Sequence, residues 1–160
     1  MNEYILIGKI VNTHALKGEV RLISDFEYKE KVFVINNELY IGKEKNKETI
    51  ETYRKHKNFD MIKFKGIETI NEVIKYKGQK VYILKETLNL GEDEILIDEL
   101  INMQVVFNNE ILGEVEEYRN DSGNKIIKVS GKYIPYNNNF IEKIDKKERK
   151  IYYKNIEGLI

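Results

Sequence analysis

The chain has 160 residues, enough for one ordinary domain or two small ones and too few for a large multidomain enzyme. Basic and acidic side chains balance at 27 each and no cysteine is present, which excludes disulfides, thiolate nucleophiles and cysteine-ligated metals. No apolar run reaches the roughly 20 residues of a transmembrane helix, and the N-terminus lacks a signal-peptide pattern, so we expect a cytoplasmic protein without a membrane partner.

Short segments with a period of two predict strands throughout the first half of the chain. Turn-forming residues such as Gly18, Asn36 and Asn37 lie between them. The predicted strands are residues 3–11, 18–24, 31–35, 38–42, 51–57, 60–64 and 79–84. Many short strands spaced about ten residues apart favour a sandwich or a barrel.

Residues 66–79 break this pattern and predict one short helix. Ile70 and Val73 fall on one face at helical spacing, and Thr69 with Glu72 forms a capping-box pattern. Gly78 stands where a helix-terminating glycine is common. A single amphipathic helix among strands is typical of a plug over one open end of a barrel.

The neutral total hides a charge difference between the two halves. Residues 1–85 carry 17 basic and 12 acidic side chains, a balance of +5, whereas residues 86–160 carry 10 and 15, a balance of −5. Segment 86–94 is polar and aperiodic, which predicts a linker between domains at 1–85 and 95–160. The difference indicates two units with different partners, although a solvated acidic linker followed by an acidic strand face explains it equally well.

The second half also reads as short strands, at residues 102–107, 111–119, 125–130, 132–136 and 150–154. Pro135 is the only proline of the chain and lies in the fourth of these segments. Because proline cannot donate a ladder hydrogen bond, we expect that strand at the edge of its sheet.

The sequence offers little for catalysis or metal binding. His14 and His56 are the only histidines and do not share a helical i, i+4 spacing, and no Gly-rich phosphate loop is present. We therefore expect no catalytic residue, no metal and no cofactor. The 23 lysines are weak evidence for nucleic-acid binding, because Lys, like the abundant Ile and Asn, is encoded by A/T-rich codons and only four arginines occur.

Two basic segments are candidates for contact with RNA. His14 and Lys17 lie in a predicted loop whose side chains and amides could meet a phosphate, or His14 simply braces the turn. In residues 53–57, Tyr53 could stack on a base while Lys55 and Lys57 contact the backbone. A polar edge strand in a lysine-rich protein explains this second segment about as well.

The opening segment GKIVNTHALKGEVRL resembles the N-terminal signature of the RimM family of bacterial ribosome maturation factors, although Ala15 stands where that family usually has Gly. Segments 54–83, 112–129 and 133–160 resemble later parts of the family in order, so the likeness covers nearly the whole chain. The matching residues are Gly8, His14, Gly18, Glu19, Arg21, Gly66, Asn71, Gly78, Val81, Gly113, Gly123, Asn124, Pro135, Asp145, Gly158 and Leu159.

One departure lies between the domains. The family often has a pair of tyrosines there, leading into Asp-Leu-Ile-Gly, whereas this chain has Ile95 and Leu96 in place of the pair and Asn102 in place of the glycine. Any stacking or hydroxyl contact that the tyrosines make is then missing here. Apolar area alone can be supplied by Ile and Leu.

The resemblance implies a mainly β protein of two small barrels. The N-terminal one would be six-stranded, similar to the second domain of translation elongation factors, with one short helix, and the C-terminal one would be of the PRC type. The function implied is that of a non-enzymatic factor for small (30S) subunit assembly, which binds the head ribosomal protein S nineteen and assists 16S rRNA processing. We expect a monomer that also meets the subunit precursor.

The charge difference is compatible with this reading, because an acidic second domain suits a basic ribosomal protein and a basic first domain suits RNA. A generic RNA-binding β-barrel protein without a specific ribosomal-protein partner is one alternative, and an enzyme built on the His14 loop is another. For the protein partner, we expect contacts from Ile95, Leu96, Asp98, Glu99, Glu114, Glu116, Glu117, Pro135 and Tyr136. The residues expected to face RNA are His14, Lys17, Arg21, Tyr53, Lys55 and Lys57.

Overall fold

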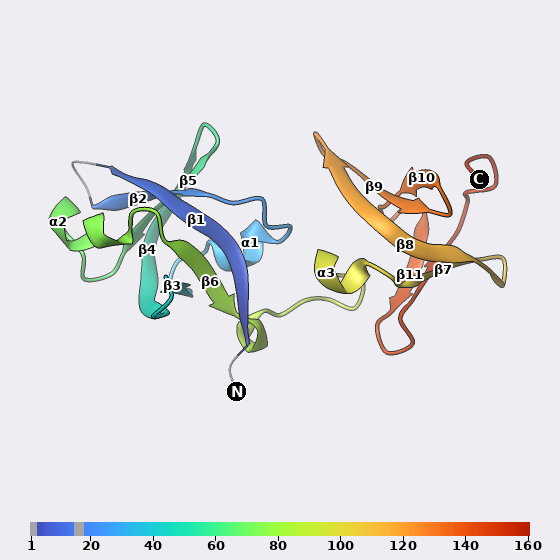
Figure 1. The fold of residues 1–160 in the computed structure, drawn as a ribbon, viewed down its shortest axis with the longest axis horizontal. Coiled ribbons are helices and arrows are strands. Elements are labelled where there is room, and N and C mark those ends of the chain that lie inside the picture. The colour runs from blue at the N-terminus through green and yellow to red at the C-terminus, as the bar shows by residue number, and fades with distance from the viewer. Residues whose placement is uncertain (1–2, 15–17) are drawn as a thin grey trace. The chain divides into compact units, whose positions relative to one another are not determined.

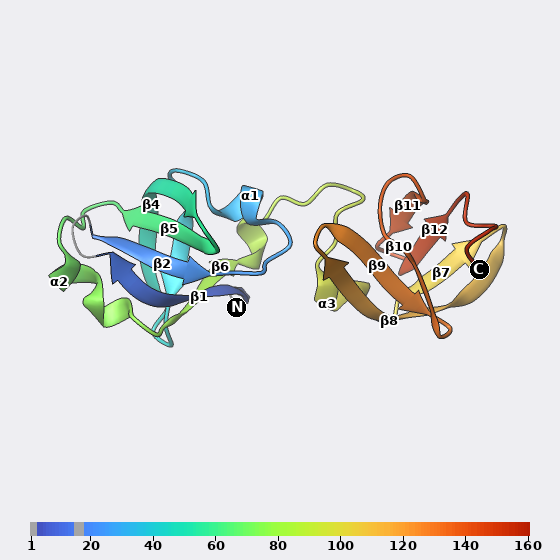
Figure 2. The ribbon, with the colours of Figure 1, turned by 90° about the horizontal axis from the view of Figure 1, so that it is seen from above.

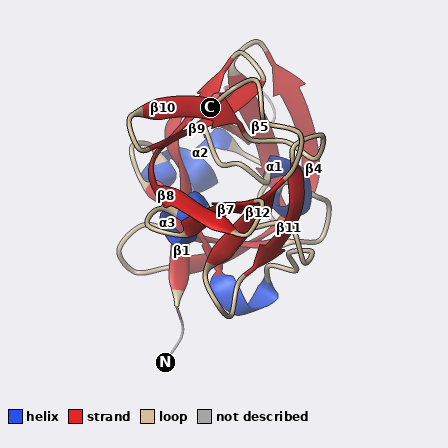
Figure 3. Cartoon of the chain, turned by 90° about the vertical axis from the view of Figure 1, so that its right-hand side faces the viewer, coloured by secondary structure: helices blue, strands red, loops and turns tan. Residues whose placement is uncertain are grey.

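The computed structural model describes residues 3–14 and 18–160, and it divides the chain into two compact units, Met1–Asn89 and Leu90–Ile160. We call these unit 1 and unit 2 and describe each by itself; unit 1 runs from blue to green in Figure 1 and unit 2 from yellow to red. Strands dominate both units, and the described helices are all short (Figure 3). The expectation of a mainly β protein is confirmed.

Unit 1 contains a six-stranded antiparallel sheet that closes into a barrel in the order β1-β2-β5-β4-β3-β6. The sixth strand closes the barrel because it pairs with both β1 and β3. Figure 2 shows β6 beside β1. The strands are β1 (Tyr4–His14), β2 (Glu19–Ile23), β3 (Glu38–Ile41), β4 (Asn46–His56), β5 (Phe59–Phe64) and β6 (Lys80–Leu84).

The long first strand curls so that it can pair with two neighbours. Its register shifts between Leu6 and Gly8 against β6, and between Ile10 and Asn12 against β2. Such bulges bend a strand and increase its twist, as a small closed barrel requires. Gly8 permits the bend, because a Cβ there would lie 2.8 Å from the carbonyl oxygen of Ile23.

Alternation along the strands fills the barrel interior. On β2, Val20 and Leu22 are fully buried, whereas Ile23 is 51% exposed on the outer surface. This is the pattern of a strand with one face on a core and one on solvent. The fully buried interior side chains include Ile10, Val20, Leu22, Leu39, Ile41, Ile50, Ile62, Phe64 and Val81.

The predicted helix of residues 66–79 is present as α2 (Ile70–Val73) followed by the 3-10 turn η1 (Ile74–Tyr76), packed against β1 and β2. The Glu72 carboxylate accepts hydrogen bonds from the Thr69 hydroxyl (3.1 Å) and the Glu68 amide (3.4 Å), rather than from the Thr69 amide of a regular capping box. Val73 is buried, so this helix does cover barrel residues.

The predicted strand at 31–35 is wrong. Residues Lys29–Val32 form the short helix α1, and Val34 and Ile35 after it are 42% and 62% exposed. The side-chain amide of Asn37 donates to the Val32 carbonyl at 2.7 Å and holds the turn that follows α1. A second unpredicted element is the 3-10 turn η2 (Lys85–Thr87), which directly follows β6.

Unit 2 contains a six-stranded sheet in the order β10-β9-β8-β7-β12-β11, in which β7 and β12 are parallel and all other pairs antiparallel. The short helix α3 (Ile97–Leu100) precedes it. Neither α3 nor β11 was expected from the sequence. The strands are β7 (Gln104–Phe107), β8 (Glu110–Asp121), β9 (Asn124–Val129), β10 (Lys132–Pro135), β11 (Ile141–Asp145) and β12 (Lys150–Tyr153).

The sheet of unit 2 is curved (Figure 1), but no backbone ladder joins β10 to β11 among the described residues, so closure into the expected PRC-type barrel is not confirmed. The curvature is concentrated in β8, which pairs with β7 and β9 and shifts register between Val115 and Glu117. Gly113 lies on this strand at φ +148°, where a Cβ would lie 2.4 Å from Ser130 Oγ. Strand β10, which ends at Pro135, lies at the edge of the sheet as predicted.

The core of unit 2 lies between α3 and the concave sheet, and its members come from every strand. Asn102, which stands in place of the family glycine, adopts φ +72°, a left-handed conformation that asparagine tolerates better than most residues. The buried members include Ile95, Leu100, Met103, Val105, Val115, Ile127, Ile134, Ile144, Ile151 and Ile156.

Candidate interaction surfaces

Tyr53 supports the barrel instead of presenting an open ring. Its hydroxyl donates a 2.6 Å hydrogen bond to Asp60 Oδ1, and its ring stacks on Phe33 with centroids 5.7 Å apart. Burial, followed by the hydrogen bond to Asp60, raises the pKa of Tyr53 to about 12. The Asp60 side chain is fully buried and also accepts from Lys29 Nζ at 3.0 Å. Base stacking by Tyr53 is not supported, because Phe33 and Asp60 already engage the side chain.

Lys55 and Lys57 lie where the β4–β5 hairpin turns, and both are exposed. Lys57 adopts φ +56°, the left-handed conformation that closes this tight turn. Neither lysine forms an ion pair with a carboxylate of the described residues. The hairpin therefore presents two cations that are available to an anionic partner.

His14 and Arg21 lie on neighbouring positions of the β1–β2 ladder, where His14 is opposite Glu19 and Arg21 is opposite Asn12. Glu19 is almost fully buried, and Arg54 donates to both of its carboxylate oxygens at 2.9 and 3.0 Å. This hydrogen bonding to Glu19 raises the pKa of Arg54.

Two buried nitrogens of this pair, His14 Nδ1 and Arg21 Nε, have no hydrogen-bond partner among the described residues. The Arg21 guanidinium lies 5.6 Å from the ring centroid of Phe59. Lys17, the third residue expected here, lies outside the described residues. The structure thus brings His14 and Arg21 together, and it places Lys55 and Lys57 on a different hairpin.

Ile95 and Leu96 are core residues. Their exposed fractions are 4% and 8%, and Ile95 packs in the core of unit 2. The Leu96 carbonyl accepts hydrogen bonds from the amides of Glu99 and Leu100, which begins α3. Because both side chains are buried within the fold, they offer little surface to a partner, and the structure gives no support for the expected contact through Ile95 and Leu96.

The acidic candidates of unit 2 differ in their surroundings. Glu114 and Glu116 on β8 are exposed and form no ion pair with a described residue. Glu117 is half-buried and accepts a 2.9 Å hydrogen bond from the Tyr133 hydroxyl. In α3, Asp98 is exposed and Glu99 is half-buried. Glu114, Glu116 and Asp98 are thus the carboxylates best placed to act on a basic partner.

Pro135 and Tyr136, at the end of β10, take part in the unit 2 fold. The Pro135 carbonyl accepts a 2.8 Å hydrogen bond from the Tyr153 hydroxyl, and burial raises the pKa of Tyr153. Tyr136 is half-buried, and its ring meets that of Tyr118 edge to face at 5.8 Å. Both side chains keep some exposed surface, so a contact with a partner through their rims is compatible with the structure.

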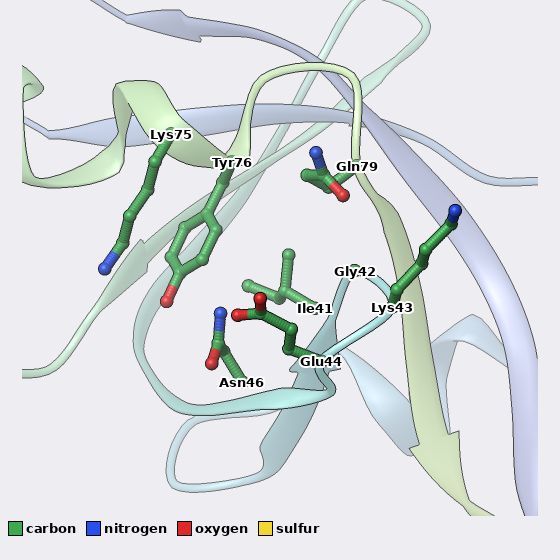
Figure 4. Close-up of a pocket in the computed structure, with 8 residues that line it drawn as sticks. All are labelled: Ile41, Gly42, Lys43, Glu44, Asn46, Lys75, Tyr76 and Gln79. Atoms are coloured by element: carbon green, nitrogen blue, oxygen red, sulfur yellow. The ribbon is translucent and has the colours of Figure 1, made fainter.

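An open hollow of about 380 Å³ lies beside the β3–β4 turn (Figure 4). The Tyr76 hydroxyl donates to Glu48, and Tyr76 is almost fully buried, which raises its pKa. The hollow mixes both signs of charge, and its lining residues are Ile41, Gly42, Lys43, Glu44, Asn46, Lys75, Tyr76 and Gln79. Among residues 3–14 and 18–160, no group of three or more His, Asp or Glu side chains could hold a metal ion.

Sequence reasoning missed one further surface on the outside of unit 1. The rings of Tyr4 and Tyr40 lie 5.3 Å apart, and those of Tyr4 and Tyr82 lie 6.4 Å apart, both edge to face. Lys45 Nζ lies 4.2 Å from the ring centroid of Tyr82. The sequence did contain a signal for this surface, because Tyr4 and Leu6 alternate along β1 with residues that face inward. We call Tyr4, Leu6, Lys9, Tyr40, Lys45, Lys80 and Tyr82 the tyrosine face.

The fold and these surfaces define a class of two-unit, mainly β proteins that present charged and aromatic outer faces. Among the described residues, no helix is long and apolar enough to cross a bilayer. The model of the RimM N-terminal domain matches residues 5–88. Its match and the full-length relatives below show that the chain belongs to the RimM family.

Curated relatives extend the likeness over both units. The chain is 38% identical to the ribosome maturation factor RimM of Exiguobacterium sibiricum, over 99% of this chain and 98% of that one. It is 35% identical to the same factor of another Exiguobacterium species, over 99% and 97%. Among solved structures, a 16S ribosomal RNA processing protein RimM from Pseudomonas aeruginosa has the same fold, with a TM-score of 0.50 at 18% identity over 96% of this chain and 98% of that one.

Proposed function

We propose that the protein is a non-enzymatic assembly factor of the small ribosomal subunit, acting in the cytoplasm as a monomer. The observation that carries the proposal is family membership along the whole chain, because the relatives that match both units are named ribosome maturation factors. The matching Pseudomonas structure is of a 16S ribosomal RNA processing protein, which favours the small subunit as the target.

The partner of unit 2 would be the head ribosomal protein S nineteen. Residues 86–160 carry a balance of −5, which suits a basic ribosomal protein, and Glu114, Glu116 and Asp98 are the exposed carboxylates that would steer the encounter. Unit 1, within the +5 stretch of residues 1–85, would lie against rRNA and assist its processing.

The mechanism would be a transient clamp that makes and breaks no covalent bonds. A factor that binds one conformer of the precursor more tightly than the others shifts the population toward it. It leaves when the mature subunit no longer offers that surface. Release then requires no chemical energy from this chain.

The test is binding of purified protein S nineteen by isothermal titration calorimetry at two salt concentrations. We expect Glu114→Lys with Glu116→Lys to weaken binding about tenfold, because each charge reversal near an interface changes the long-range attraction, and we expect the loss to shrink at high salt. The matched control is Glu142→Lys with Glu157→Lys, which changes the same total charge at exposed positions elsewhere in unit 2. Equal effects of the two double variants would refute steering by β8.

A generic RNA-binding protein without a protein partner is the second candidate, favoured by the unpaired Lys55 and Lys57 at the β4–β5 hairpin. The two candidates separate in one complementation experiment. Lys55→Glu with Lys57→Glu abolishes function if RNA binding is the whole activity, whereas Glu114→Lys with Glu116→Lys leaves it intact. If the protein is instead the assembly factor proposed above, the variant with Glu114→Lys and Glu116→Lys loses function.

A further inference from the structure

We infer that the tyrosine face of unit 1 binds single-stranded RNA, stacking unpaired bases on its rings and holding phosphates with its lysines. The inference rests on the proposed function only for the source of that RNA. It involves a different surface from the β1–β2 loop and the β4–β5 hairpin considered above.

The aromatic side chains share the outer surface of three adjacent strands. On β6, Tyr82 alternates with the buried Val81 and Ile83, and it lies opposite both Leu6 of β1 and Tyr40 of β3. Leu6 is 52% exposed, although it lies in the middle of this apolar group. Cross-strand aromatic contacts alone would stabilise the sheet, but they do not explain an open Leu among half-exposed rings.

Two lysines of this face repel each other and so lower the stability of the unbound protein. Lys9 and Lys80 are directly opposite each other in the antiparallel β1–β6 ladder, and both are exposed. Like charges in this arrangement destabilise a sheet. Neither forms an ion pair with a carboxylate of the described residues. An anion bound between them would remove the repulsion.

Lys45 is fixed over the rings by the β3–β4 turn. It adopts φ +54°, and its ammonium lies 4.2 Å from the Tyr82 centroid and 5.4 Å from the Tyr4 centroid. A cation at this distance is attracted to the ring face, which keeps the positive charge beside the aromatic surface. Of the two carboxylates whose charge acts on Tyr40 at the edge, Glu38 is already paired with Lys47 at 3.1 Å, and Glu86 is outnumbered by Lys9, Lys45 and Lys80. The face is therefore net positive where its rings are accessible.

This combination fits unpaired RNA better than a protein or a duplex. Lysine is depleted from the centres of protein interfaces, whereas three lysines surround these rings. A duplex presents its backbone and keeps its bases stacked, so it would leave the tyrosines unused. Single strands expose both phosphates and base faces, and proteins bind them with aromatic platforms beside basic side chains.

The first experiment measures the binding of a fluorescein-labelled single-stranded RNA of about 12 nucleotides to the full chain by fluorescence anisotropy. We expect Tyr82→Ala to raise Kd roughly 5- to 150-fold if the ring stacks on one base, and Tyr82→Phe to restore binding. The control is Tyr152→Ala in unit 2, where Lys143 lies 4.8 Å from the ring centroid, and it should leave Kd unchanged. Circular dichroism on each variant confirms that it is folded.

The second experiment measures how Kd depends on salt. Each phosphate contact to a single strand contributes about 0.7 to the slope of log Kd against log salt concentration. Lys9→Gln with Lys80→Gln should therefore reduce the slope by about 1.4. The same double variant should be at least as stable as the wild type, since it removes a repulsion.

An RNA affinity that is the same for the wild type, Tyr82→Ala and Tyr82→Phe would overturn the inference. So would equally tight binding of duplex RNA that also depends on Tyr82, or loss of a protein partner without loss of RNA binding in the Tyr82→Ala variant. Failure of the proposed function is visible separately. In that case the chain does not bind protein S nineteen or sediment with subunit precursors, while the oligonucleotide results are unaffected.

Discussion

The substitution Tyr53→Phe removes one hydroxyl group and tests whether the hydrogen bond from Tyr53 to the buried Asp60 stabilises the unit 1 barrel. The Asp60 carboxylate is fully buried, and its Oδ1 accepts the 2.6 Å hydrogen bond from Tyr53 while its Oδ2 accepts from Lys29. A hydrogen bond to a charged group contributes about 1.5–3 kcal/mol, and the variant leaves Oδ1 without this donor. Because Phe keeps the stacking on Phe33, the packing is conserved. We expect the free energy of unfolding of unit 1 to fall by about 2 kcal/mol.

The same hydroxyl gives a pH dependence with a defined sign. The folded-state pKa of Tyr53 is raised to about 12, above the unfolded value of about 10. The stability from its protonated form is therefore complete below pH 10 and lost as pH rises through about 12. Since the ring is partly exposed, we expect about 1 kcal/mol over this range.

The assay is urea unfolding of the full chain, with hydrogen exchange of the β4 and β5 amides to isolate unit 1 because two units need not unfold together. Tyr82→Phe is the matched control, since no hydrogen bond of the Tyr82 hydroxyl joins it to a described residue, and its effect should stay within about 0.5 kcal/mol. The reasoning is refuted if Tyr53→Phe is as mild as this control, or if its stability falls between pH 10 and 12 as steeply as that of the wild type.

Three further substitutions test other parts of the structure. Ile95→Ala should lower the unfolding free energy of unit 2 by about 3 kcal/mol in urea titrations, because it opens a cavity in the core; an unchanged stability would restore Ile95 as a surface anchor. Gly113→Ala should destabilise unit 2 by at least about 2 kcal/mol, and adding Ser130→Gly should recover only the steric part, since φ remains +148°. Arg54→Lys should lower the thermal midpoint, because an ammonium cannot reproduce the two parallel N–H···O bonds that the planar guanidinium makes to Glu19; no shift would show that the pair contributes nothing.

Strands were predictable wherever the ladder is regular. The alternation of Val20 and Leu22 with outward neighbours on β2 is visible in the sequence and was found. Strand β11 was missed for a physical reason, because its register shifts between Ile141 and Lys143 and its buried residues, Ile141 and Ile144, are three positions apart. A period of two cannot detect such a strand.

A short apolar run also led to the prediction of a strand that the structure does not contain. Residues 31–35 are apolar enough for a strand, but only Val32 and Phe33 are buried, and they cover the barrel end beside Tyr53. A single helical turn such as α3 is too short to show a period of its own. Length and local pattern could not separate these cases.

The surfaces were less predictable than the fold, because they depend on which strands become neighbours. Tyr4, Tyr40 and Tyr82 are far apart in the sequence and meet only through the pairing of β6 with β1 and β3. Conversely, the local sequence around Tyr53 was compatible with base stacking and with a polar edge strand, and only the fold revealed that Phe33 and Asp60 contact its side chain. The family resemblance predicted the architecture well, but it did not show that Ile95 and Leu96 are buried.

The position of β12 has a consequence for biosynthesis. This strand is translated after the other five strands of its sheet, yet it lies inside the sheet of unit 2, between β7 and β11. A nascent chain that has not reached Lys150 therefore holds β7 with one flank unpaired and β11 with no neighbour at all. Unit 2 can complete its sheet only after Tyr153 has been made, whereas every strand of the unit 1 barrel has been made by Leu84. The two halves of the protein thus mature at different moments of their own synthesis.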